Sequence, residues 1–180
     1  MAAPLIVAVA ALAFTVASFW WLNARRGRLV AAALDAYAVG NPPDDLMLRL
    51  PLAIHNTGAK ALVVGNLRCR FPDSDAPDQP WRTTRKILGT GPGDVEDDAT
   101  PFPVEGRHAV PKVIEFGDRS TAVKLSPRTY RVLIEVDHTL AGSAGTTWRK
   151  LVEFDLHVDS KALHGNYVAH RNLANGSGHP

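Results

Sequence analysis

The segment LRLPLAIHNTGAKALVVGNLRCRF, residues 48–71, decides the fold, because its apolar residues stand at every second position. Successive side chains of a β-strand point to opposite faces, so this alternation predicts a half-buried strand. Pro51 has no N–H for a sheet hydrogen bond, which predicts a sheet edge or a bulge at that point. The apolar row consists of Leu46, Leu48, Leu50, Leu52 and Ile54, and the opposite row of Met47, Arg49, Pro51, Ala53 and His55.

A turn and a second strand complete the segment. The turn NTGA, residues 56–59, contains Asn56 and Gly58, which are residue types that accept turn geometries, and glycine is free to adopt a positive φ. Beyond the turn, Arg68 and Arg70 alternate with an apolar row of Val63, Leu67, Cys69 and Phe71. We therefore expect a hairpin or a pair of successive strands that acts as a scaffold and not as a reactive site.

The same alternation returns twice in the C-terminal half. The Gly-containing connector 139–146 lies between the two runs and predicts a C-terminal hairpin. Shorter strands are expected at 81–88, 102–105 and 110–116, and residues 29–39 fit either a continuing helix or a first strand, of which we favour the strand. The inward rows are Tyr130, Val132, Ile134 and Val136, with Leu133 as the exception, and then Val152, Phe154, Leu156 and Val158.

Seven or eight short strands within about 130 residues indicate an all-β fold, an antiparallel immunoglobulin-like β-sandwich preceded by one N-terminal transmembrane α-helix. We divide the chain into an anchor with its arginine cluster (1–28), a β-sandwich domain (29–159) and a flexible C-terminal tail (160–180). Tyr167 is the tail residue that we expect to pack back on the domain.

An uncharged run of 19 residues, 4–22, predicts the transmembrane helix. At about 1.5 Å per residue it just crosses a hydrocarbon core of about 30 Å. Trp20 and Trp21 end the run at the expected headgroup level, and Arg25, Arg26 and Arg28 follow in water. A cleaved signal peptide is the rival interpretation. We favour a retained anchor, because no basic residue precedes the run and its end is bulky.

Basic residues resist translocation, and those near the helix all follow it, so the domain is expected to face the cytoplasm. Without Arg25, Arg26 and Arg28 the chain has 17 basic and 18 acidic residues, a balance that excludes nucleic acid as an expected partner. Cys69 is the only cysteine, which suits a reducing compartment and rules out an intramolecular disulfide.

Several strings together resemble a group of uncharacterised bacterial single-pass membrane proteins with a short N-terminal anchor and an immunoglobulin-like β domain. The resemblance covers most of the chain from about residue 20 onward and implies an architecture but no activity and no catalytic residues. It is carried by RRGRL (25–29), LRLPLAIHNTGA (48–59), LVVGNLRCRF (62–71), PFPVEGRHA (101–109), IEFGD (114–118) and YVAHRN (167–172).

No motif predicts a cofactor or metal site. The seven histidines lack ligand spacing such as HExxH, and one cysteine cannot form a CxxC pair. The acidic loops 73–78 and 94–98 contain oxygen ligands for a divalent cation but lack the Gly and Glu of a calcium loop, so we interpret them as solvated loops. The Gly-rich stretches 89–93 and 141–145 complete neither a phosphate loop nor a nucleophile elbow.

The remaining candidates are surface residues. Arg68 and Arg70 point outward from one strand and are expected to form a basic patch with the juxtamembrane arginines, one that attracts anionic headgroups. His55 beside the turn is the histidine that we single out. We expect a membrane-tethered binding module, not an enzyme, with the lipid bilayer and a cytoplasmic protein as partners. The alternative is an outward-facing envelope protein that binds a ligand or a cell surface.

Overall fold

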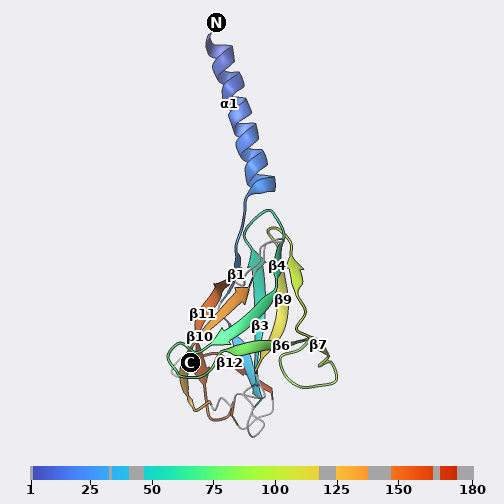
Figure 1. Ribbon diagram of the computed structural model, residues 1–180, viewed down its shortest axis with the longest axis vertical. Coiled ribbons are helices and arrows are strands. Elements are labelled where there is room, and N and C mark those ends of the chain that lie inside the picture. Colours follow the sequence, from blue (N-terminus) through green and yellow to red (C-terminus); the bar gives the residue numbers. More distant parts are fainter. Residues whose placement is uncertain are drawn as a thin grey trace, which may run out of the picture.

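The computed structural model describes residues 2–32, 34–40, 47–117, 125–137, 147–163 and 167–173 (Figure 1). Leu46, the connector 139–146 and the chain beyond residue 173 lie outside these ranges, as do His138, His164 and His179. The N-terminal elements are α1 (Ala2–Phe19), the π-helical turn η1 (Trp20–Ala24), β1 (Leu29–Ala31), β2 (Ala36–Gly40), β3 (Met47–Asn56), β4 (Leu62–Val64) and β5 (Asn66–Arg70). They are followed by β6 (Gln79–Arg85), β7 (Glu96–Asp98), β8 (Phe102–Val104), β9 (Ala109–Phe116), β10 (Arg128–Asp137), β11 (Trp148–Val158) and β12 (Val168–Arg171).

The alternating segment forms β3 at the centre of the fold. Its predicted apolar row is buried, with Leu48, Leu50, Leu52 and Ile54 at most 1% exposed. β9 pairs along one side of β3, while β2 and β1 pair with 47–49 and 54–56 on the other. Pro51 falls in the gap between β2 and β1, where the strand is locally an edge and a missing N–H is tolerated.

The second strand of the segment does not form a hairpin with β3. β5 pairs with β10 and β6, so the pair of successive strands is the alternative that the structure adopts. The predicted inward row of Val63, Leu67, Cys69 and Phe71 is wrong at its first residue, because Gly65 separates β4 from β5. Val63 is 43% exposed, whereas Val64 is fully buried.

Antiparallel pairing joins the strands into a curled sheet. In the described part of the chain the order is β11-β10-β5-β6-β9-β3-β2-β12, with β1 added to β3 and β7 to β6, and β4 pairs separately with β8. β6 pairs with β5 through its first residues and with β9 from Trp81 onward, so the sheet turns there. The apolar faces of the two halves enclose one continuous core that runs from Leu29 to Ala162.

The C-terminal strands pair as the sequence predicts. β10 and β11 are antiparallel neighbours, and their inward rows are buried while Leu133 is only half-buried. β11 has a bulge opposite Ile134 and Glu135. The extra residue there, Leu151, is buried together with the inward row of β11. The three shorter strands are also confirmed as β6, β8 and β9. In the segment 29–39, the described residues form the strands β1 and β2 and not a continued helix.

The expected flexible tail needs a correction, because its middle part belongs to the sheet. β12 pairs with β2, from Val168 opposite Val39 to Arg171 opposite Ala36. Asn172 then accepts a bond from the backbone N–H of His157 at 2.9 Å and donates to the carbonyl of Asp155 at 2.8 Å. These contacts tie the C-terminal segment to both halves of the fold, which the polar composition of residues 160–180 does not reveal.

The N-terminal helix projects from one end of the β domain (Figure 1). Residues Ala3–Ala24 form a candidate membrane span of 22 residues with mean hydropathy 2.2, and none of it is buried in the protein. An apolar helix that is not buried in the protein is suited to lipid and not to water. By length and composition alone, a signal sequence near the N-terminus fits this helix as well as a membrane span does.

Candidate functional site

The helix ends in the aromatic and basic residues that the sequence predicts. Trp20 and Trp21 are 55% and 52% exposed. The guanidinium of Arg25 lies 4.0 Å from the centre of the Trp21 ring, a cation–π contact. Arg26 and Arg28 are exposed immediately below. These five residues therefore gather at the junction of helix and domain.

Two glycines hold the chain after the helix against the domain. A Cβ at Gly27 would lie 1.9 Å from the backbone nitrogen of Gly58, and a Cβ at Gly58 would lie 2.1 Å from that of Gly27. Neither position has room for a side chain. Gly58 does not have the positive φ that its place in a turn suggested, so it is glycine because of this close approach.

Hydrogen bonds complete this junction clamp, which we define as residues 25–28 bound to the turn 57–59. Ala59 N–H donates to the carbonyl of Arg25 at 2.9 Å. Thr57 N–H donates to the carbonyl of Arg28 at 3.1 Å, and Arg28 N–H donates to the Thr57 hydroxyl at 3.0 Å. The chain that leaves the helix is thus a fixed part of the domain and not a free linker.

Asn56 shapes the turn that receives the helix. Its buried side-chain amide donates to the carbonyls of Lys60 and Val104, at 2.8 and 3.0 Å, and its side-chain oxygen accepts the N–H of Gly58 at 2.9 Å. The amide therefore joins the turn after β3 to the end of β8. The turn of the opening segment therefore supports the helix junction.

A second turn, between β8 and β9, reaches the helix itself. Arg107 donates from Nη2 to the carbonyl of Trp21 at 2.5 Å. The turn is closed by a bond from His108 N–H to the carbonyl of Glu105 at 3.2 Å, and Arg107 has a φ of 60°. Sequence reasoning missed Arg107 and Lys60, because both lie in turns outside the alternating pattern.

The predicted surface arginines are neutralised within the domain. Arg68 donates to Glu135 at 2.7 Å and to Asp78 at 3.0 Å, and Arg70 donates to Asp78 at 2.8 Å. The bond and charge of Asp78 raise the pKa of Arg70. The structure gives neither arginine a contact with Arg25, Arg26 or Arg28. Both guanidinium groups are therefore paired with carboxylates of the domain, and a patch that joins them to the juxtamembrane arginines stays a prediction.

His55 and the acidic loops take ordinary structural places. His55 is half-buried on β3, in register between Val30 and Ala109. The carboxylates of Asp78 and Asp94 form ion pairs with arginines. Residues 96–98 form the short strand β7. Within the described ranges, no group of three or more His, Cys, Asp or Glu side chains is placed to hold a metal ion.

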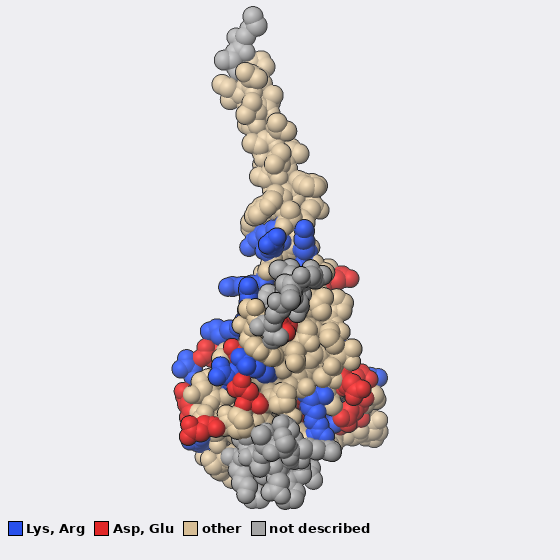
Figure 2. All heavy atoms as spheres, in the orientation of Figure 1, with Lys and Arg blue, Asp and Glu red and all other residues tan. Residues whose placement is uncertain are grey.

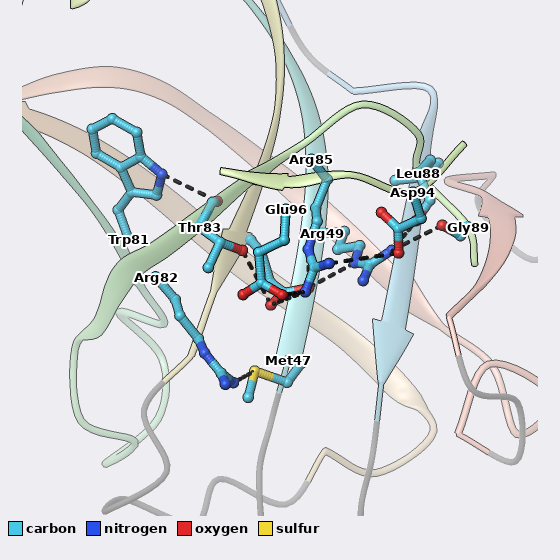
Figure 3. Close-up of polar contacts among 11 residues, drawn as sticks. Met47, Arg49, Trp81, Arg82, Thr83, Arg85, Leu88, Gly89, Asp94 and Glu96 are labelled. Carbon is cyan, nitrogen blue, oxygen red and sulfur yellow. Dashed lines mark hydrogen bonds and ion pairs between the residues drawn. The ribbon is translucent and has the colours of Figure 1, made fainter. Parts of the chain in front are cut away.

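A buried ion network lies at the opposite end of β3 from the junction clamp (Figure 3). Arg49 is only 2% exposed and donates from Nε to Glu115 at 2.7 Å, across the β3–β9 pair. Its Nη1 donates to the carbonyl of Gly89 at 2.8 Å and to Asp94 at 3.1 Å. The ring of Tyr167 lies 3.9 Å from its guanidinium. Arg49 thus binds the β6–β7 loop and the C-terminal segment to the sheet.

Arg85 supplies the second cation of this network. It pairs with Glu96 at 2.9 Å, Glu115 at 3.4 Å and Asp94 at 3.6 Å. Burial lowers the pKa of Arg85, but Glu115, Glu96 and Asp94 outweigh burial, and the net direction is upward. Burial, together with the charge of Glu115, raises the pKa of Tyr167 to about 12. Two arginines are thus paired with three carboxylates, an arrangement that fits a structural ion network joining the sheet to the loop before β7.

Two open hollows mark the outer faces of the sheet. One, of about 550 Å³, lies over β3, β6 and β9 and has Pro51, Ala53, Pro111 and Val113 in its floor. The other, of about 690 Å³, lies over β10 and β11 and is lined mainly by charged side chains, among them Arg131 and Glu153. The domain therefore offers one largely apolar and one charged concave surface.

Comparisons with known proteins add no family. No family model matches the chain, and no curated protein matches it. Among solved structures, it is similar to the crystal structure of a protein from Archaeoglobus fulgidus, with 11% identity and a TM-score of 0.37. That similarity covers 72% of this chain and 98% of the other. Similarity at this level carries no argument about function.

Proposed function

We propose that this chain is a single-pass membrane protein whose β domain faces the cytoplasm and binds a protein partner there. The apolar helix, wholly outside the domain, supports the anchor, as do the exposed tryptophans at its end. The arginines that follow support the cytoplasmic side. A lone, buried cysteine suits the same compartment.

The junction clamp is the observation that carries this proposal. A binding domain that only needs to stay near a membrane can hang from a flexible linker. Here residues 25–28 are hydrogen-bonded to the domain, and two glycines pack backbone against backbone. The orientation of the domain is thereby fixed relative to the helix. We interpret the fixed orientation as a way to hold one side of the domain toward a protein partner, at a constant distance from the bilayer.

We further propose that the curled sheet is an immunoglobulin-like sandwich. One strand group, β11-β10-β5, faces another, β9-β3-β2, across the common core, and β6 joins them. The side-chain hydroxyl of Tyr37 on β2 donates to the carbonyl of His157 on β11 at 2.6 Å, which links the two groups. Loops and edges of such sandwiches commonly bind proteins.

An outward-facing envelope protein with a cleaved signal is the second candidate, since the helix lies near the N-terminus. The contacts at Trp21 favour the retained anchor. Arg25 stacks on its ring and Arg107 binds its carbonyl, and cleavage after residue 22 would remove both contacts.

Two measurements test the proposal. C-terminal fusions to a reporter active only in the cytoplasm and to one active only after export give the topology, and the mass of the mature chain shows whether residues 1–22 are retained. A photo-crosslinking residue at Ala53 and another at Thr129 then sample the two hollows in intact membranes. Activity of the cytoplasmic reporter, an intact mass and a discrete crosslinked protein are expected. Activity of the exported reporter alone, or a shortened chain, would overturn it.

A further inference from the structure

We propose that the membrane-proximal end of the domain is a binding surface for anionic phospholipid headgroups. The surface, here named the basic collar, consists of Arg25, Arg26, Arg28, Lys60 and Arg107. It rests on the proposed function, because it requires the helix to span a bilayer. It differs from the patch expected from the sequence, since Arg68 and Arg70 are excluded and two turn residues replace them.

The structure places the turns that carry Lys60 and Arg107 against the end of the helix, which is headgroup height if the helix spans a bilayer. Arg107 binds the carbonyl of Trp21, a residue whose ring belongs at the interface if the helix spans the membrane. Lys60 follows Ala59, whose N–H binds the carbonyl of Arg25. The domain therefore adds its own cations to those of the chain leaving the helix. Figure 2 shows Lys and Arg side chains around the base of the helix.

The charge of this end is not balanced. Residues 25–28 and the turns 57–61 and 105–108 contain five basic residues and one acidic residue, Glu105. Of 20 basic and 18 acidic residues this leaves 15 and 17 for the remaining chain, a net charge of −2. No carboxylate in the described ranges pairs with a collar cation, whereas Arg49, Arg68 and Arg85 are each paired with two or more. The collar cations are therefore available to lipid phosphates.

Arg107 has a left-handed backbone conformation that favours glycine. It is the second central residue of its turn with a φ of 60°, a conformation that costs an ordinary side chain energy. The glycine of this turn is instead Gly106, where a Cβ would lie 2.0 Å from the carbonyl oxygen of Ala59. An arginine held in a strained turn, directed at the helix end, fits a role that requires its charge.

The test uses the full chain in lipid nanodiscs with increasing phosphatidylglycerol in phosphatidylcholine. The readout is backbone hydrogen exchange in the turns 57–61 and 105–108. We expect exchange there to slow as the phosphatidylglycerol fraction rises, and the effect to vanish in about 0.5 M salt, where the screening length is only a few Å. Each Lys or Arg near an anionic bilayer strengthens the association of the collar with the headgroups about fivefold.

Matched variants separate lipid binding from folding. R26Q/K60Q removes two exposed collar charges whose side chains take no part in the clamp. We expect the collar of this variant to associate about 25-fold more weakly with the phosphatidylglycerol headgroups. K86Q/K161Q removes the same charge elsewhere on the domain and should change nothing. R107G relieves the strained φ, so it should retain the unfolding midpoint while it weakens the lipid effect about fivefold.

Three outcomes decide the matter. Equal exchange in neutral and anionic discs, or equal losses in the collar and control variants, would overturn the basic collar while leaving the anchored domain standing. A chain that does not enter nanodiscs would overturn the proposed function itself. Slowed exchange that depends on phosphatidylglycerol and on Arg26 and Lys60 supports both.

Discussion

Arginines gather in two regions of this molecule, and the structure uses them in opposite ways. At the distal end of β3, the buried Arg49 and the half-buried Arg85 are each paired with the carboxylates of Glu115 and Asp94. At the helix junction, Arg26, Arg28 and Lys60 are exposed, and no carboxylate of the described residues pairs with them. The difference teaches that burial and partner geometry, not residue type, decide whether an arginine stabilises a fold or stays free to bind.

Replacing Arg49 should break the first region with the largest effect. Arg49→Met leaves Glu115 buried beside only Arg85, and loss of one partner of a buried ion pair costs about 3–5 kcal/mol. Urea unfolding of the detergent-solubilised chain measures it. The double variant R49M/E115M removes the orphaned carboxylate and should recover part of the loss. Equal destabilisation by the single and double variants would contradict this account.

Filling the glycine contact should open the second region. Gly58→Ala places a methyl group against the backbone of Gly27, and overpacking of this kind costs about 1–3 kcal/mol. Trypsin cleavage after Arg25, Arg26 and Arg28 should become about tenfold faster, because these residues lose their backbone partners. Gly93→Ala is the control, since no atom lies within 4 Å of its added Cβ. Unchanged cleavage in G58A would show that the junction is not held by this contact.

Alkaline pH should weaken the core between the two regions. Burial, with the charge of Asp78, raises the pKa of the Cys69 thiol far above its usual range. The folded pKa exceeds the unfolded value of about 8.5, so the unfolded chain loses this proton first and stability falls as pH rises above it, by about 1.4 kcal/mol per unit. Unfolding midpoints at pH 7.5, 8.5 and 9.5 measure the slope. Cys69→Ala should flatten it, and an unchanged slope would exclude the thiol.

Removing the carboxylate that pairs with Arg68 and Arg70 should have the smallest effect on stability. It also tests the difference between paired and unpaired arginines directly. Asp78→Asn removes the carboxylate between Arg68 and Arg70, and an exposed pair contributes less than about 1 kcal/mol. The chain should nevertheless bind a cation-exchange resin at higher salt, because two guanidinium groups lose a partner. A large loss of stability would indicate that this pair, too, is structural.

The sequence by itself determined the long strands and the helix. Alternation at Leu48, Leu50, Leu52 and Ile54 requires only that one face be buried, and that is a local property of a pleated strand. The helix and its Trp and Arg boundary likewise follow from an uninterrupted apolar run. For the same reason the C-terminal pair was predictable, since its two strands are neighbours in sequence and in space.

The tertiary structure decided how distant residues meet. Arg49 stands in the row opposite the core and is nevertheless buried, because Glu115, the loop before β7 and Tyr167 cover that face from positions far along the chain. Gly58 is glycine because Gly27 lies against it, and β12 joins the sheet because β2 offers a free edge. Partners separated by many residues leave no period in a single sequence. The roles of Arg49, Gly58 and β12 are therefore set only when the sheet curls and distant segments pack against it.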